Sequence, residues 1–204
     1  MSAANESPRA SGRWQLPLIA FVVFFPVVGA MALFYGGWRP SGQVNHGELI
    51  EPPRLWPQIE LRQLDGSAVT TGAESGNWLM VYVAAAGCDA NCEAALDLMQ
   101  RLRISQGPQS DRVVNALIVL DPAPDSGLAP LATRFPGTRI WLATRTDVPA
   151  LRAHFGLPIT DFDPGAIRFV DPRGYYMMRF PPGADPSGAR KDLARLLKLS
   201  KDQS

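Results

Sequence analysis

The sequence contains few of the residues that hold small metal or disulfide scaffolds together, with two cysteines and two histidines in 204 residues. Two cysteines allow one intrachain bridge and exclude a disulfide framework, and no Cys/His cluster has zinc-finger spacing. Neither sign of charge dominates, since 20 basic and 19 acidic residues leave a formal net charge of +1. There is no basic run and no basic patch interleaved with aromatics, which argues against nucleic acid as a partner. Internal repeats are absent as well.

One long uncharged run is present, from Gln15 to Gly37, and it is flanked by Trp14 and Trp38. As a helix this run would be roughly 34 Å long, which is enough to cross a bilayer. Tryptophans at both ends are typical of the interfacial belts of membrane helices. We therefore predict a transmembrane anchor over residues 14–38 that contacts the lipid bilayer, preceded by a short tail at 1–13.

A cleaved signal peptide is the alternative, because Ala30-Met31-Ala32 has the small-x-small pattern of a cleavage site. The apolar run is long for a signal peptide and continues through Leu33, Phe34 and Tyr35. This length favours an uncleaved, single-pass anchor.

Basic residues flank the run on both sides, with Arg9 and Arg13 before it and Arg39 and Arg54 after it. The positive-inside bias is weak but favours a cytoplasmic N-terminus. We predict a protein of a bacterial-type inner membrane whose remaining chain is periplasmic. A thiol pair on that side meets oxidising conditions, where a disulfide can form and persist.

Beyond the anchor, residues 39–56 are polar and rich in proline and glycine, which indicates a tether, and residues 57–200 show the patterns of a folded domain. Nearly continuous apolar runs are typical of strands buried on both faces, and apolar residues at helical spacing indicate helices between them. The predicted elements are a hairpin over 58–71, a buried strand at 77–86, a helix over 88–107, a buried strand at 112–121, a helical or irregular stretch through 135, a strand at 138–144, a helix at 147–157, a hairpin over 166–180 and a closing helix over 185–201. This order predicts an α/β sandwich with a mixed central sheet, in a thioredoxin-like arrangement.

The two cysteines, Cys88 and Cys92, fall where the first buried strand ends and the next helix begins. The N-terminus of a helix stabilises a thiolate over a thiol. With one cysteine in the turn before the helix, a disulfide is feasible, although the spacing does not require it. The carboxylates of Asp89 and Glu93 oppose the helix dipole, and the sequence does not decide which effect is larger.

Three interpretations of the pair are open. It is a redox couple in which the more exposed Cys88 attacks and Cys92 resolves, a soft two-sulfur clamp for copper(I), or two small buried residues. Because these are the only two cysteines of the chain and lie together at this turn, we predict that Cys88 and Cys92 are the catalytic and metal-binding residues.

The domain resembles the Sco (SenC) family over roughly residues 55–200. The motifs that carry the resemblance are LRQLDG at 61–66, GNWLMVYVAAAGCDANC at 76–92 with its C-x3-C pair, LIVLDPAPD at 117–125 and VDPRGYY at 170–176. This resemblance implies a membrane-anchored thioredoxin-like factor that delivers copper to, or reduces thiols in, the copper A centre of cytochrome c oxidase.

The sequence departs from the family at two places. Glu93 follows the second cysteine, where the family usually has proline, and the late segment ITDFDPGAIRFVD at 159–171 lacks the histidine that the family uses as third copper ligand. Asp163 and Pro164 in this segment are possible contributors near the site, and Pro164 is compatible with the cis-proline that thioredoxin folds often place opposite the cysteines.

Two histidines lie elsewhere. His154 is expected to be a partly exposed residue of a helix, and His46 lies in the tether, with nothing in the sequence that directs it to the thiols. Neither is predicted to be a ligand.

We therefore interpret the chain as a membrane-anchored protein that assists assembly of the copper centre of cytochrome c oxidase through its C-x3-C dithiol, by binding copper(I) or by reducing thiols. Its expected partner is a cytochrome c oxidase subunit or another copper or thiol protein. Two alternatives stay open: a general extracytoplasmic thiol–disulfide oxidoreductase, and a non-catalytic scaffold bound to a respiratory complex.

Overall fold

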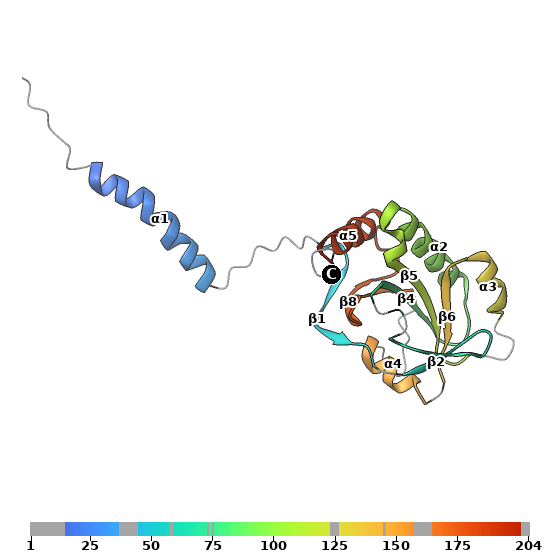
Figure 1. Cartoon of the computed structure of the whole chain (residues 1–204). Helices are drawn as coiled ribbons and strands as arrows, with labels where there is room; N and C mark the ends of the chain where they lie inside the picture. Colours follow the sequence, from blue (N-terminus) through green and yellow to red (C-terminus); the bar gives the residue numbers. More distant parts are fainter. Residues whose placement is uncertain are drawn as a thin grey trace, which may run out of the picture. The chain divides into compact units, whose positions relative to one another are not determined.

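The computed structural model describes residues 15–36, 45–57, 59–72, 74, 76–122, 127–144, 146–156 and 165–200. The chain divides into two compact units, Met1–Gln43 and Val44–Ser204. Among the described residues, the first unit contains one helix and the second contains a sheet with its covering helices (Figure 1).

The helix of the first unit is α1 (Gln15–Tyr35), with Pro26 in its interior. The stretch Pro17–Tyr35 has a mean hydropathy of 2.5, and none of it is buried within the structure. A helix of this length is about 30 Å long, which matches the hydrocarbon thickness of a bilayer. Its position near the N-terminus, its length and its composition fit a membrane anchor or a signal sequence.

The described part of the second unit is built on an eight-stranded mixed sheet. The strands are β1 (Glu48–Leu55), β2 (Glu60–Gln63), β3 (Ala68–Thr70), β4 (Trp78–Ala84), β5 (Val113–Val119), β6 (Thr138–Leu142), β7 (Ile167–Val170) and β8 (Tyr175–Phe180). Their order across the sheet is β1-β8-β7-β4-β5-β6-β2-β3. The neighbours β4, β5 and β6 run parallel, and every other pair is antiparallel.

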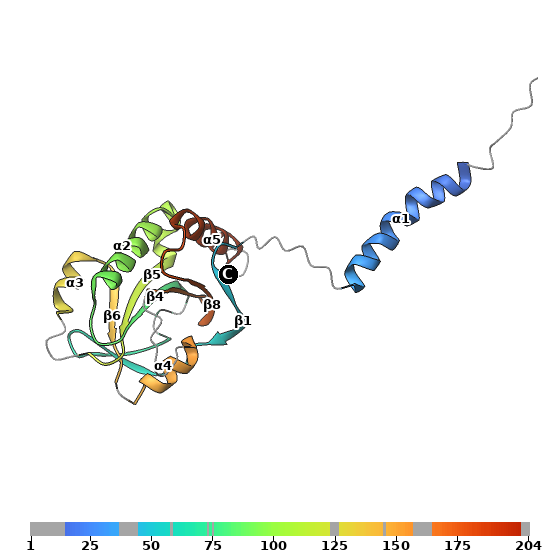
Figure 2. The ribbon, with the colours of Figure 1, turned by 180° about the vertical axis from the view of Figure 1, so that it is seen from behind.

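Helices cover both faces of this sheet. They are α2 (Ala90–Ile104), the 3-10 helix η1 (Gly107–Arg112), α3 (Ala129–Arg134), α4 (Val148–Phe155) and α5 (Pro186–Leu199). Parallel neighbours need a crossover connection, and α2 and α3 supply the crossovers from β4 to β5 and from β5 to β6. In Figures 1 and 2, α2, α3 and α5 lie on one face and α4 lies on the other. The α/β sandwich with a mixed sheet is therefore confirmed.

Strand β4 is the centre of this arrangement, and all seven of its residues are buried. Successive side chains of a strand point to opposite faces, so β4 contributes to two cores. Trp78, Met80, Tyr82 and Ala84 pack into the core under α2 and α5, whereas Leu79, Val81 and Val83 pack into the core under α4. Because both faces are packed, β4 delivers the turn that contains Cys88 to a fixed position at its carboxyl end.

Strand β1 is the main difference from the sequence analysis, which assigned residues 39–56 to a tether. Residues Glu48–Leu55 pair with β8 in antiparallel orientation and form one edge of the sheet. The strand has no burial alternation for a pattern to detect, since seven of its eight residues are exposed. Pro52 and Pro53 are also tolerated in a strand only at such an edge.

A buried carboxylate holds the chain just before β1. Asp192 of α5 is 2 % exposed, and its Oδ2 accepts hydrogen bonds from the backbone N–H groups of His46 at 2.6 Å and Gly47 at 3.0 Å. The His46 Nδ1 atom lies 3.2 Å from Asp192 Oδ1. A Cβ atom added at Gly188 would lie 2.6 Å from the His46 side chain. We call His46, Gly47 and Asp192 the clasp, because together they dock the start of the domain on α5.

The second histidine is buried, and the expectation of a partly exposed His154 is wrong. His154 is 6 % exposed, at the end of α4, and packs against Trp56, Phe155 and Tyr176. Burial lowers the pKa of His154 to about 4, although a hydrogen bond with the backbone of Leu55 opposes the shift. The helical pattern alone does not show that Trp56 and Tyr176, from distant parts of the chain, cover the last turn of α4.

The clasp predicts a loss of stability when its acceptor is removed. Asp192→Ala leaves two buried or partly buried N–H donors without their acceptor, which should lower the free energy of unfolding by about 2 kcal/mol. Asp192→Asn retains an acceptor oxygen and should lose less. Urea unfolding of the full chain in detergent measures both, and hydrogen exchange at residues 46 and 47 should accelerate in the alanine variant. Equal losses for the two variants would contradict this assignment.

His154 predicts a dependence of stability on pH. The folded state keeps the imidazole neutral, whereas the unfolded histidine titrates near pH 6.5, so the unfolded state binds more protons below that value. The stability that comes from keeping His154 neutral is therefore fully present above pH 6.5 and is lost as the pH falls towards about 4. The free energy of unfolding should fall by about 3 kcal/mol in total across this window. His154→Phe should flatten the decline of unfolding free energy across this window. Parallel pH profiles for the two proteins would show that His154 does not cause it.

Candidate functional site

The structure joins the two cysteines. Cys88 and Cys92 form a disulfide with a Cα–Cα distance of 5.2 Å, which lies in the usual range for such bridges. Cys92 is 1 % exposed and belongs to the core under α2. Cys88 is half-buried and packs against the edge of the same core. Cys88 is thus the more exposed residue of the pair.

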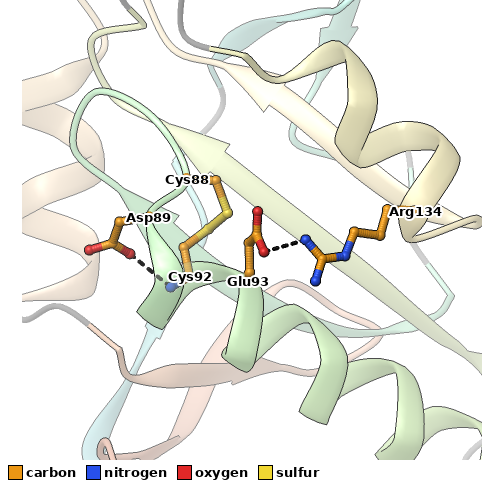
Figure 3. Close-up of a disulfide and its surroundings, with 5 residues drawn as sticks. All are labelled: Cys88, Asp89, Cys92, Glu93 and Arg134. Carbon is orange, nitrogen blue, oxygen red and sulfur yellow. Dashed lines mark hydrogen bonds and ion pairs between the residues drawn. A yellow bond between two sulfur atoms is a disulfide. The ribbon is translucent and has the colours of Figure 1, made fainter.

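Asp89 determines where the helix begins between the two cysteines. It is the N-cap of α2, and its Oδ1 accepts a hydrogen bond from the Cys92 N–H at 2.9 Å (Figure 3). The backbone carbonyl of Asp89 accepts the N–H of Glu93 at 2.9 Å, which is the first bond of the helical ladder. Because α2 starts at Ala90, Cys88 lies in the preceding turn, and the two side chains converge although they are four positions apart.

A second carboxylate flanks the disulfide on its other side. Glu93 of α2 forms an ion pair with Arg134 of α3 (Figure 3). The Arg134 guanidinium also lies 5.4 Å from the centre of the Phe135 ring. Arg134 is exposed, so the pair contributes little to stability. Its local effect is to offset the charge of Glu93 beside the two sulfurs.

The turn before Cys88 is held by the neighbouring strand. The N–H groups of Leu120 and Asp121 donate to the carbonyls of Ala84 and Ala85 at 2.9 and 2.8 Å, which extends the β4–β5 pairing beyond both strands. Ligands of α/β sheets usually bind near the carboxyl ends of parallel strands. A pocket of about 350 Å³ lies there, lined by Ala85, Ala86, Leu120, Asp121, Val148 and Arg152.

A larger, mainly apolar groove of about 480 Å³ runs beside α2. It begins at Asn91, next to Cys92, and is completed by residues that precede and start α5. Its α2 and α5 walls are formed by Asn91, Ala94, Ala95, Leu98, Leu102, Pro186 and Ala189. A partner that approaches the disulfide therefore meets apolar surface alongside it.

The remaining predicted contributors are not brought to the disulfide by any described contact. Asp163 and Pro164, together with Asp161, lie outside the described residues. His46 is engaged with Asp192, and His154 packs in the core on the opposite face of the sheet from Cys92. Within the part of the chain that the structure describes, no group of three or more His, Cys, Asp or Glu side chains is arranged to hold a metal ion.

Two neighbours of the cysteines have roles that the sequence analysis did not assign. Asp89 entered it only as a charge, although aspartate just before a helix is a favoured N-cap and could have been identified as one. Arg134 lies 41 positions from Glu93. No local pattern in the sequence signals that contact.

Comparison with known proteins identifies the family. The family model described as "Transmembrane-like, thioredoxin-like, C-terminal domain" matches residues 78–200, which is more than half of the chain. The chain belongs to this thioredoxin-like family. Among proteins with curated descriptions, none matches the sequence.

Solved structures show the same thioredoxin-like fold at low sequence identity. ScoI of Bradyrhizobium japonicum with copper bound has a TM-score of 0.55 at 19 % identity, over 70 % of this chain and 99 % of that one. BsSco, studied for a disulfide switch and described as a member of the Sco family of cytochrome c oxidase assembly proteins, has a TM-score of 0.55 at 12 % identity, over 72 % and 96 %. The thioredoxin domain of a thiol-disulfide oxidoreductase from Bacteroides vulgatus has a TM-score of 0.55 at 16 % identity, over 70 % of this chain and 95 % of that one. The predicted thioredoxin-like fold is confirmed, and the chain resembles Sco proteins in structure.

The burial difference within the pair predicts unequal reactivity. After gentle reduction of the folded protein, Cys88 should react with iodoacetamide at least about tenfold faster than Cys92, because access controls the rate of alkylation. Mass spectrometry of the peptides over time measures both rates. In urea the two rates should converge, and a faster Cys92 in the folded protein would contradict the arrangement.

Proposed function

We propose that this protein is a membrane-anchored thioredoxin-like factor that assists assembly of the copper centre of cytochrome c oxidase through the Cys88–Cys92 dithiol. The observation that carries this proposal is the position of the pair: two cysteines joined at the start of α2, of which Cys88 is only half-buried. The structural resemblance to Sco proteins, among them one with copper bound and one with a disulfide switch, supports it.

In the thiol reaction, the Cys88 thiolate attacks one sulfur of a disulfide on the partner protein. The partner's disulfide breaks, a mixed disulfide with Cys88 forms, and the partner's other sulfur leaves as a thiolate. The Cys92 thiolate then attacks the Cys88 sulfur and releases the second partner thiol. The partner gains two electrons and two protons, and this chain ends with the Cys88–Cys92 bridge. A dithiol of another protein must reduce that bridge again.

Copper(I) is the proposed cargo. Reduction of the bridge yields two thiolates that converge from one turn, and soft sulfur donors suit copper(I). The described residues contain no group of three or more metal-ligating side chains. Cys88 and Cys92 would therefore hold the ion as a two-coordinate pair or share it with a ligand of the partner. Low coordination favours transfer to a site with more ligands.

We further propose that residues 14–38 anchor the protein in a bacterial-type inner membrane, with tail 1–13 in the cytoplasm and the thioredoxin-like domain, 57–200, in the periplasm. The apolar helix α1 supports the anchor, and a periplasmic location would supply the oxidising conditions that a reversible disulfide needs. Strand β1 and the clasp extend the folded part to His46, so residues 39–45 remain as the tether of this proposal.

The test is an anaerobic titration of the reduced full-length chain, in detergent, with copper(I) against a competing chelator. The wild-type chain should bind one copper(I) ion, and the Cys88→Ser, Cys92→Ser double variant should lose at least about a hundredfold in affinity, since serine oxygen is a poor ligand for a soft ion. Equal affinities for the two proteins would remove copper(I) from the proposal.

The thiol arm is measured separately with a disulfide-bonded peptide that carries the two copper A cysteines of the oxidase subunit. The reduced wild-type chain should convert it to the dithiol, and both single serine variants should fail to complete the reaction. Reduction without copper binding would identify the general thiol–disulfide oxidoreductase, which the observed disulfide also favours. Failure of both reactions would leave the scaffold as the surviving interpretation.

A further inference from the structure

The first turn of α2 does not offer Cys88 the full stabilisation that a helix start can give. A thiolate beside a helix N-terminus is normally stabilised by the free N–H groups and the positive end of the dipole. Here the N–H of Cys92 donates to the Asp89 carboxylate at 2.9 Å. Asp89 also places a negative charge in the segment between the two cysteines, where it repels a thiolate.

The two carboxylates that flank the pair differ in their partners. Glu93 forms an ion pair with Arg134, so its charge is offset. In the described part of the chain, Asp89 has only the backbone N–H of Cys92 as a partner and no cation. Figure 3 shows the two carboxylates on opposite sides of the disulfide, one directed at the helix backbone and the other at the guanidinium. Among the described residues, the carboxylate beside the sulfurs that has no cation as a partner is therefore that of Asp89.

We propose that Asp89 is a positioning residue that lowers the reduction potential of the Cys88–Cys92 pair and thereby makes the dithiol a stronger electron donor to its partner. Reduction of the bridge takes two electrons and two protons, and any stabilisation of a Cys88 thiolate favours the reduced form. By occupying the Cys92 N–H and adding negative charge, Asp89 removes part of that stabilisation. The substrate class is then a protein disulfide with a higher potential, which is reduced as the Cys88–Cys92 bridge forms.

This inference rests on the proposed dithiol function and specifies its direction. A pair whose first turn lacked this carboxylate would be the stronger oxidant. With Asp89 in place, the equilibrium of the pair is shifted towards donating electrons to a partner disulfide. The Cys88–Cys92 bridge would be the product of that reaction, and an external dithiol must then restore the reduced form.

The test measures the redox equilibrium of the full-length chain in detergent. The protein is equilibrated with dithiothreitol buffers of graded potential, the free thiols are trapped, and the oxidised fraction is read by mass. Asp89→Asn keeps an oxygen that accepts the Cys92 N–H and remains a favoured N-cap, but removes the charge. It should shift the equilibrium towards the dithiol about tenfold, which corresponds to about 30 mV.

Two control variants test whether the charge of Asp89 in particular shifts the redox equilibrium, and in which direction a nearby negative charge acts. Glu93→Gln should shift the equilibrium less than about threefold, because Arg134 already offsets that charge, and Arg134→Gln should shift it towards the disulfide, because the charge of Glu93 is then uncompensated. The urea midpoint of oxidised Asp89→Asn should equal that of the wild type, which separates the electrostatic effect from a loss of the cap. Asp89→Ser, also a neutral cap, serves as the second variant if the asparagine protein does not fold.

A shift below twofold for Asp89→Asn, a shift towards the disulfide, or equal shifts for Asp89→Asn and Glu93→Gln would overturn the inference. None of these readings uses copper or a partner protein. A chain that failed both assays of the proposed function would still report the Asp89 effect on its own disulfide, so the two failures are distinguishable.

Discussion

The hydrogen bond from the Cys92 N–H to the Asp89 carboxylate is the interaction on which the site depends. It ends the turn that follows β4 and starts α2 at Ala90, so that Cys88 stays outside the helix while Cys92 lies inside it. Two cysteines four apart within a helix would not meet with good bridge geometry. Strand β4 supplies the other constraint, because packing on both of its faces leaves the turn little freedom to move. The half-buried Cys88, the buried Cys92 and the carboxylate beside them all follow from these two features.

The parts of the fold that the sequence predicts are those whose burial leaves a continuous or a periodic apolar pattern. The apolar run at 77–86 and the helical spacing after Cys92 correspond to β4 and α2, and the late hairpin and closing helix correspond to β7, β8 and α5. Strand β1 escaped prediction because seven of its eight residues are exposed, and its pairing with β8 joins residues more than a hundred positions apart. His154 and Asp192 escaped for a related reason. Their burial depends on Trp56, Tyr176 and His46, which only the folded chain brings to them.

For the site, the position of the two cysteines followed from the strand–helix boundary, and the structure joins them there. The sequence analysis treated Asp89 and Glu93 as equivalent carboxylates. The structure separates them, because Arg134 from α3 pairs with Glu93 alone. That contact spans two crossovers of the sheet, and spacing in the sequence carries no trace of it. Glu93, at the position where the Sco family that the sequence resembles usually has proline, thus forms an ion pair beside the disulfide, and Asp89 is the charge that we propose acts on the sulfurs.

Trapping of the mixed disulfide tests the central claim, that a partner's sulfur is exchanged at Cys88. The Cys92→Ser chain, expressed in a cell that contains the oxidase and isolated after acid quenching, should carry a covalently attached protein that reducing agent releases, and its attachment should map to Cys88. The Cys88→Ser chain should carry none, since its remaining sulfur is buried. Absence of any adduct on Cys92→Ser, or equal adducts on both variants, would contradict the account.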